Sequence, residues 1–306
     1  LMMSIEPCFP KGVDLEALLT KLRFLSWGAS AILRAYARGQ KPPYGFPEAL
    51  DIQNGGEGPV SAADLAVNKW LIDGLQENFP DANWTLLSEE TAKEQLKEGE
   101  PIAAEWLWIL DPLDGTKDFL QGTGQYAVHL GLVHNNQPLL GVVLLPELEE
   151  LWLGVVGVGA WCEDIKGNRS SVMFSQRRKL RDLIIVSSRN HRDLRLEKLI
   201  EKLDLGGTKS IGSVGCKIAT ILRGEADLYL SLSGKSAPKD WDMAAPEAVL
   251  RAAGGSFTHV DLAPLEYNTG DVRQAGCLLA SHGLNHTEIC ELTLKEIQLI
   301  DPDFSV

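Results

Sequence analysis

The chain has 306 residues, of which 44% are hydrophobic and 23% are charged, so it suits a globular protein and excludes wholesale disorder. Its formal net charge is -13, which makes it a poor candidate for coating DNA or RNA, because such binding needs Lys and Arg to neutralise phosphates. A small anionic ligand stays compatible with this charge, since a few local cations or bound metals can reverse the field inside one cleft.

The five cysteines are far apart and include no C-x-x-C pair, which argues against a disulfide framework and a zinc knuckle. A reducing compartment is therefore expected, and the first residues do not resemble a secretion signal. No apolar stretch approaches the roughly 20 residues of a membrane span. We expect a cytoplasmic protein that binds neither a membrane nor nucleic acid.

Two long helices and a set of strands are predicted for the first part of the chain. Leucines recur at helical spacing over residues 13–38, and a second apolar stripe predicts a helix over residues 61–79. Short apolar runs bounded by turn or acidic residues are typical of strands. The expected strands cover residues 84–87, 106–110, 126–133, 139–145 and 151–160.

Shorter helices and strands alternate after a basic segment at residues 177–181. We therefore predict two halves, residues 1–176 and residues 177–306, within an α+β protein whose second half has α/β character. The expected strands of the second half cover residues 183–186, 228–230 and 278–280, and the expected helices cover residues 194–203, 217–222, 243–253 and 285–300.

Acidic residues follow several of these elements directly. Glu89 comes after the strand over 84–87, Asp111 and Asp114 come after the strand over 106–110, and Asp242 opens a helix. Strand ends are where sheet proteins place ligand sites, and converging carboxylates repel one another unless a hard cation lies between them. Oxygen-rich sites of this kind favour magnesium or calcium.

The segment from Asp111 to Thr116 is the centre of this hypothesis. Pro112 bends the chain, so that Asp111 and Asp114 could face one point, and Gly115 allows the backbone to approach a ligand closely. A helix that starts here would offer free N–H groups to a phosphate.

Each of these acidic residues also has a purely structural explanation. Asp and Gly favour turns, so the segment 111–116 is equally consistent with a turn, and Glu89 suits a solvated acidic surface. Asp64 lies three residues after Ser61, as in a capping box, and Asp242 suits the start of a helix. The residues by themselves leave both explanations open.

Four segments together resemble the inositol monophosphatase superfamily of metal-dependent, lithium-sensitive phosphatases. The resemblance implies a layered α-β-α-β-α sandwich with a metal site between its halves, and it covers roughly residues 15–281. The four segments are Pro59-Val60-Ser61-Ala62-Ala63-Asp64, Leu87-Ser88-Glu89-Glu90, Asp111-Pro112-Leu113-Asp114-Gly115-Thr116-Lys117-Asp118-Phe119 and Trp241-Asp242-Met243-Ala244-Ala245-Pro246-Glu247.

Roles for these residues are implied by the same resemblance. Asp64 and Thr116 would orient and deprotonate an attacking water, without a phosphoenzyme, and the N–H groups of Gly115 and Thr116 would hold the phosphate. Two or three Mg²⁺ ions would be bound. Their implied ligands are Glu89, Asp111, Asp114, Asp242 and the carbonyl group of Leu113.

Within the superfamily, the chain most resembles the 3'(2'),5'-bisphosphate nucleotidases of sulfur metabolism. Lys117 follows the D-G-T, and the segments 187–191, 212–217 and 239–242 resemble nucleotide-contact segments. The implied substrate is adenosine 3',5'-bisphosphate or its sulfated form, bound by a monomer or a homodimer. The implied substrate contacts are Gly115, Thr116, Ser188, His191, Ser213, Lys217 and Asp242.

Other classes of phosphatase share some of these sequence features. An inositol monophosphatase or a sugar bisphosphatase of the same fold is the main alternative. Haloacid-dehalogenase-type phosphatases carry one residue between their two aspartates, whereas Pro112 and Leu113 both stand between Asp111 and Asp114. Ser231 and Leu232 occupy positions where some nucleotidases carry an Arg, so the chain departs from those nucleotidases at this point.

Overall fold

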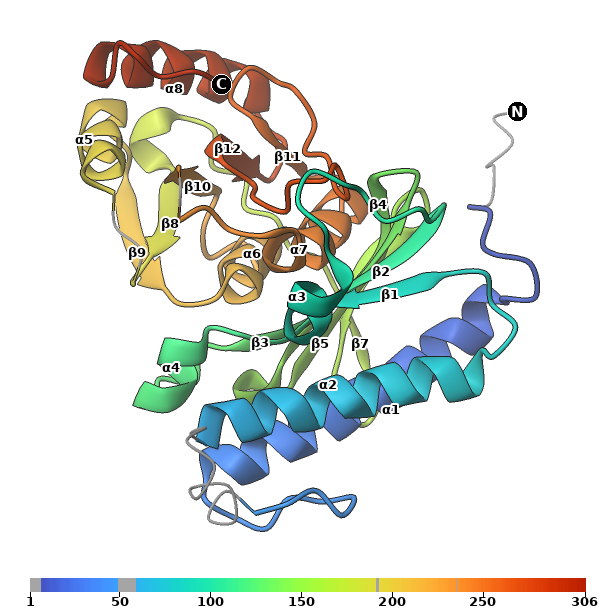
Figure 1. Ribbon diagram of the computed structural model, residues 1–306. Coiled ribbons are helices and arrows are strands. Elements are labelled where there is room, and N and C mark those ends of the chain that lie inside the picture. Colours follow the sequence, from blue (N-terminus) through green and yellow to red (C-terminus); the bar gives the residue numbers. More distant parts are fainter. Residues whose placement is uncertain (1–6, 49–58, 191–192, 235) are drawn as a thin grey trace, which may run out of the picture.

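Layers of helices and sheets alternate in the computed structural model (Figure 1). The first layer is a pair of long helices, α1 (Leu15–Ala37) and α2 (Pro59–Asn78), which confirm the helices predicted at these positions. Asp14 caps α1, because its side chain accepts a hydrogen bond from the backbone N–H of Ala17. The structure describes residues 7–48, 59–190, 193–234 and 236–306.

The second layer is a seven-stranded sheet in which the strands follow chain order. β1 runs parallel to β2, and each later neighbouring pair is antiparallel. The segment 151–160 continues the sheet as expected, but as two strands, because a turn at Gly157, with a positive φ of 88°, separates β5 from β6. The strands are β1 (Thr85–Ser88), β2 (Trp106–Asp114), β3 (Ala127–His134), β4 (Gln137–Leu145), β5 (Glu150–Val155), β6 (Gly159–Glu163) and β7 (Arg169–Ser171).

A five-stranded sheet of order β11-β12-β10-β8-β9 forms the fourth layer. β9 and β11 carry few apolar residues, so the sequence does not indicate them. Its strands are β8 (Ile184–Ser188), β9 (Gly207–Ile211), β10 (Leu228–Ser233), β11 (Ser256–His259) and β12 (Gly276–Ser281). The helices of the third and fifth layers are α5 (Leu194–Leu203), α6 (Val214–Leu222), α7 (Asp240–Ala252) and α8 (His286–Ile300). Short helical segments are η2 (Glu89–Thr91), α3 (Ala92–Gln95), α4 (Thr116–Gln121), η3 (Pro146–Leu148) and η4 (Leu180–Asp182).

Alternate residues of the strands face different helix layers. In β2, Trp108 packs under α1 and α2, whereas Ile109 packs in the middle layer with α6 and α7. In β10, Tyr229 faces this same middle layer, and Leu230 packs against α5 and α8. These clusters confirm the α+β fold class and the layered α-β-α-β-α sandwich.

Three glycines let α7 lie close to the first sheet. Gly131, Gly141 and Gly154 stand side by side on β3, β4 and β5. A Cβ atom on Gly141 would lie 2.4 Å from the carbonyl oxygen of Ala245, and one on Gly154 would lie 2.7 Å from Cα of Val249. The glycine row (Gly131, Gly141 and Gly154) therefore fixes the depth at which α7 sits on the sheet.

The two sheets are drawn from successive parts of the chain. β7 ends at Ser171 and β8 begins at Ile184, on either side of the boundary expected at residue 177. However, α6 and α7 belong to the later part and pack against strands of both sheets. The division into residues 1–176 and 177–306 therefore stays a prediction.

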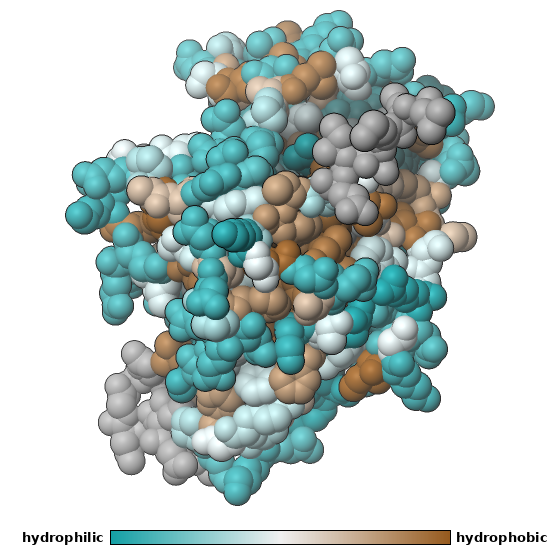
Figure 2. Space-filling view, turned by 90° about the vertical axis from the view of Figure 1, so that its right-hand side faces the viewer, coloured by the Kyte–Doolittle hydropathy of each residue, from teal (hydrophilic) through white to brown (hydrophobic). Residues whose placement is uncertain are grey.

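Hydrophilic residues predominate on the molecular surface shown in Figure 2, and hydrophobic residues gather mainly across the middle of this face. The hydrophilic cover agrees with the charged fraction of 23%. Within the described ranges, no helix combines the length and the apolarity that crossing a membrane requires.

Candidate active site

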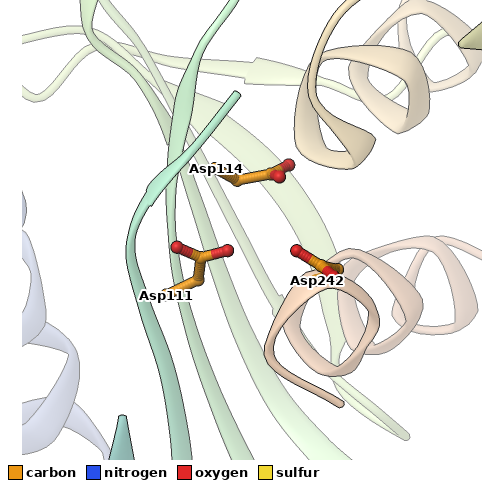
Figure 3. A group of neighbouring side chains, drawn as sticks. All are labelled: Asp111, Asp114 and Asp242. Carbon is orange, nitrogen blue, oxygen red and sulfur yellow. The ribbon is translucent and has the colours of Figure 1, made fainter. Parts of the chain in front are cut away.

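Three aspartates from two elements converge between the sheets (Figure 3). Asp111 and Asp114 lie at the end of β2, and Asp242 lies in the first turn of α7. Each offers one carboxylate oxygen, and these atoms all lie within 4.8 Å of one another. The convergence that the sequence predicts for these three side chains is thus present.

Pro112 explains how both aspartates of β2 face this centre. Residues three apart in a regular strand point to opposite faces. Pro112 has no N–H for the ladder, and the register with β3 shifts between Asp111 and Asp114. The N–H of Leu113 donates instead to Oδ1 of Asp111 at 3.1 Å. This irregularity turns both carboxylates toward α7.

The first turn of α7 orients Asp242. Its Oδ2 accepts a hydrogen bond from the backbone N–H of Lys239 at 2.7 Å, as expected for an acidic residue at a helix start. Burial raises the pKa of Asp242 to about 7, and the charges of Asp114 and Glu89 add to this rise. The carboxyl group is therefore held in place but is costly to ionise.

The cluster gathers more negative charge than a buried site holds without a cation. Burial raises the pKa of Asp111 well above its usual range, and the charges of Glu89 and Asp114 raise it further. Burial also raises the pKa of Glu89. A hard divalent cation such as Mg²⁺ fits this all-oxygen donor set, because its charge offsets the repulsion among the carboxylates.

Asp114 also anchors the start of α6. Its Oδ2 accepts hydrogen bonds from the hydroxyl of Ser213 and from the N–H of Val214, both at 2.7 Å. Ser213 has a positive φ of 62°, and its hydroxyl accepts the N–H of Cys216, so it caps α6. The hydroxyl of Ser213 is thus engaged with Asp114, whereas the resemblance implied a contact with the substrate.

His129 is a buried neighbour of the cluster that the sequence reasoning missed. It pairs with Asp111 across β2 and β3. Its Nδ1 lies 3.1 Å from the carbonyl oxygen of Trp241, and its Nε2 lies 3.5 Å from Oδ2 of Asp114. Burial lowers the pKa of His129. Because the carbonyl oxygen of Trp241 can only accept a hydrogen bond, this contact requires a proton on Nδ1. A polar residue at an inward position of an apolar strand was the available signal.

A cavity of about 820 Å³ opens over the acidic cluster and extends to the second sheet. Its lining does not include Asp64, and His191 lies outside the described residues. Most of the residues expected at the site do line it. They are Glu89, Asp111, Leu113, Asp114, Gly115, Thr116, Ser188, Ser213, Lys217 and Asp242.

Lys217 brings a buried cation to this cavity. Only 3% of its surface is exposed, and its Nζ donates to the carbonyl oxygen of Ile211 at 3.2 Å. The ammonium group also lies over the ring of Tyr229, 5.3 Å from its centroid. Burial lowers the pKa of Lys217, while the nearby Asp114 opposes this effect. An anionic ligand would compensate this buried positive charge.

Asp64 and Thr116 lie on helices that flank the cluster. Burial raises the pKa of Asp64 to about 8, and the charges of Glu90 and Glu89 contribute. Thr116 is exposed and begins α4, after Gly115 with a φ of 92°. A side chain on Gly115 would meet the carbonyl oxygen of Gln125 at 2.8 Å, so the position requires glycine. The joint role of Asp64 and Thr116 stays a prediction.

The chain matches the inositol monophosphatase family over residues 14–298, so it belongs to this family of metal-dependent phosphatases. It is 35% identical over 211 residues to the 3'(2'),5'-bisphosphate nucleotidase CysQ of Escherichia coli K12, a match that covers 68% of this chain and 79% of that protein. It is 29% identical over 237 residues to the fructose-1,6-bisphosphatase/inositol-1-monophosphatase of Aquifex aeolicus, covering 75% of this chain and 84% of that one.

Two solved structures share the layered fold of this chain. The inositol monophosphatase from Anabaena superimposes with a TM-score of 0.71 at 24% identity, covering 92% of this chain and 97% of that one. CysQ from Bacteroides thetaiotaomicron superimposes with a TM-score of 0.65 at 24% identity, covering 85% and 97%. The layered fold is thus common to an inositol monophosphatase and to a CysQ protein.

Proposed function

We propose that the chain is a Mg²⁺-dependent 3'(2'),5'-bisphosphate nucleotidase that converts adenosine 3',5'-bisphosphate to AMP and phosphate and acts also on the sulfated form. The observation that carries this proposal is a single cavity that is lined both by the acidic cluster and by the buried Lys217. A nucleoside bisphosphate has two phosphate groups, so one could bind at the acidic cluster with its cations and the other could bind Lys217. The 35% identity to the nucleotidase of E. coli supports the same choice.

The residues of the site suggest a direct displacement by water. Glu89, Asp111, Asp114, Asp242 and the carbonyl group of Leu113 would hold two or three Mg²⁺ ions. Bound Mg²⁺ would supply positive charge to the phosphate oxygens and lower the pKa of a water molecule.

Proton transfer and phosphate binding would fall to residues of the chain itself. Asp64 would accept the proton of the attacking water through the hydroxyl of Thr116. The water oxygen would bond to phosphorus as the bond between phosphorus and the ribose oxygen breaks. The ribose oxygen would then take up a proton from solvent. The N–H groups of Gly115 and Thr116 would hold the phosphate during this step.

A phosphatase acting on inositol phosphates or sugar bisphosphates is the second candidate, favoured by the likeness to the A. aeolicus enzyme. Kinetics at fixed Mg²⁺ with adenosine 3',5'-bisphosphate, its sulfated form, inositol 1-phosphate and fructose 1,6-bisphosphate separate the two. We expect the highest kcat/KM for adenosine 3',5'-bisphosphate. A higher value for inositol 1-phosphate or fructose 1,6-bisphosphate would overturn the proposal.

Lys217→Met tests the part of the site that is specific to a nucleotide bisphosphate. Methionine keeps the buried aliphatic stem and removes the charge, so we expect KM for adenosine 3',5'-bisphosphate to rise about tenfold or more, as for a lost charge-assisted hydrogen bond. KM for inositol 1-phosphate should change much less. Lys69→Met, at a lysine 68% exposed on α2, is the matched control. Equal effects of Lys217→Met on both substrates would contradict the assignment.

The remaining expectations stay predictions of the same proposal. They are the monomeric or homodimeric state, the cytoplasmic location, the sensitivity to lithium and the place in sulfur metabolism. Adding LiCl to the Mg²⁺-supported reaction and measuring the loss of activity would test the sensitivity to lithium directly.

A further inference from the structure

Asp118 is a buried carboxylate in the first turn of α4 that the proposed mechanism leaves without a role. It lines the cavity, yet its side chain is only 1% exposed. Three side-chain donors surround it. The hydroxyl of Thr123 donates to Oδ1 at 2.7 Å, Nη1 of Arg189 donates to Oδ1 at 3.1 Å, and Nδ2 of Asn190 donates to Oδ2 at 2.9 Å.

These donors come from both sides of the cavity. Thr123 follows α4 and belongs to the part of the chain that carries Gly115 and Thr116. Arg189 and Asn190 follow β8, in the second sheet, and Asn190 itself lines the cavity. The carboxylate of Asp118 therefore ties the expected phosphate end of the site to the segment that follows Ser188.

A third segment approaches the same carboxylate. A Cβ atom on Gly212 would lie only 2.0 Å from Oδ2 of Asp118, so the link between β9 and α6 passes directly against it. Arg189 also donates to the carbonyl oxygen of Ser210 on β9, at 3.4 Å. α4 and the segments after β8 and β9 thus meet at Asp118.

The chemistry of this junction makes it resistant to displacement. A buried carboxylate that loses a donor keeps its full desolvation cost, and a hydrogen bond from a guanidinium group is stronger than one between neutral groups. α4 follows β2 of the first sheet, and the segment after β8 leaves the second sheet. The hydrogen bonds from Arg189 and Asn190 to Asp118 join these two segments directly.

We propose that Asp118 is a positioning residue for substrate selection. It sets the width of the cavity between Gly115 and Thr116, which are expected to hold the phosphate, and the segment Ser188–Asn190 on the opposite side. This inference rests on the proposed function, because the group that needs this segment is the nucleoside part of the substrate. Loss of the Asp118 carboxylate therefore impairs the hydrolysis of phosphate esters with a large second moiety, such as a nucleoside bisphosphate, more than the hydrolysis of a compact ester such as inositol 1-phosphate.

Asp118→Asn tests the inference, since asparagine keeps the shape and removes the charge that holds Arg189. We expect the ratio of kcat/KM for adenosine 3',5'-bisphosphate to kcat/KM for inositol 1-phosphate to fall about tenfold, through KM of the nucleotide. Arg189→Leu removes the charged donor from a side chain that is 33% exposed, and it should lower the same ratio. The effect of the double variant should be smaller than the product of the single effects.

Asp227→Asn is the matched control. Asp227 is also buried, and it accepts Nε of Arg177 at 2.7 Å and the N–H of Ile184 at 2.8 Å, but it does not line the cavity. Its variant should lower the unfolding temperature and leave the substrate ratio as it is.

The outcomes separate this inference from the proposed function. If the wild-type protein prefers the nucleotide but both Asp118→Asn and Arg189→Leu keep the wild-type ratio, the role of Asp118 is wrong and the nucleotidase assignment stands. A fall in kcat that is equal for both substrates would likewise overturn it. If the wild-type protein does not hydrolyse adenosine 3',5'-bisphosphate, both the proposed function and the inference fail.

Discussion

Asp64 is the residue that we propose as the acceptor of the proton of the attacking water. Burial and the neighbouring Glu90 and Glu89 raise its pKa to about 8 in the metal-free protein. Cations bound at Glu89 would lower this pKa again, so the carboxylate would become available for proton transfer only in the loaded site. A raised pKa and proximity to Glu89, an expected metal ligand, both suit a general base.

We therefore predict that Asp64→Asn lowers kcat about 100-fold or more, because an amide cannot accept the proton of the attacking water. Mg²⁺ binding, measured by calorimetry, should survive, since Asp64 is not among the expected ligands. Asp73→Asn is the control on the same helix, where the carboxylate is exposed and paired with Lys69 at 2.6 Å. A near-normal kcat for Asp64→Asn would exclude the role assigned to it.

At the scale of single elements, α7 determines the position of Asp242, and the glycine row determines how closely α7 packs against the first sheet. Gly141→Ala would place a methyl group 2.4 Å from the carbonyl oxygen of Ala245, so the helix must move outward. We expect a loss of about 1–3 kcal/mol in the free energy of unfolding, as in other overpacked cores. Mg²⁺ binding should also weaken, because Asp242 moves with the helix.

Gly207→Ala on β9 provides the comparison for this prediction. The nearest atom to an added methyl group there is Cγ1 of Ile184, at 3.8 Å, so the substitution fits without displacement. Urea unfolding and calorimetric Mg²⁺ titration of both variants would distinguish them. Unaltered Mg²⁺ affinity in a destabilised Gly141→Ala variant would show that the packing position of α7 does not determine Mg²⁺ binding.

The elements that the sequence predicts are those with strong apolar patterns. The long helices and the strands β3 and β4 follow from periodicity, whereas β9 and β11 are polar and escape it. The acidic cluster is predictable once the resemblance to the inositol monophosphatases is added, because the carboxylates at these positions alone also suit turns and helix caps. The contact between His129 and Trp241 is not predictable, because it joins residues 112 positions apart and depends on how α7 meets the sheet.

At the scale of the whole molecule, we expect the buried carboxyl groups to make the stability of the metal-free protein depend on pH. Burial raises the pKa of Glu247 to about 8, despite Arg251 at 3.5 Å. A carboxyl group with a raised pKa binds more protons in the folded than in the unfolded state, so its stabilising effect is lost as pH rises toward that pKa. We predict that stability in EDTA falls between about pH 5 and pH 8.

Glu247→Gln isolates the part of this dependence that does not come from the metal site. Glutamine stays neutral at every pH, so the variant should lose less stability than the wild-type protein as pH rises. Urea unfolding in EDTA at several pH values measures the difference. A wild-type pH dependence in the variant would mean that the protonation of Glu247 does not couple to folding.

Bound Mg²⁺ should make the protein more stable as pH rises, because the carboxyl groups of the acidic cluster must lose their protons to bind the cation. Burial and the charge of Asp114 raise the pKa of Asp242 to about 7, so protons compete with the cation below neutral pH. We predict that saturation with Mg²⁺ raises the urea midpoint more at about pH 8 than at about pH 5.5, with proton release on binding. Asp242→Asn should abolish most of this gain, whereas Glu247→Gln should retain it. An equal gain at both pH values would show that the cluster is already ionised in the folded protein without its cation.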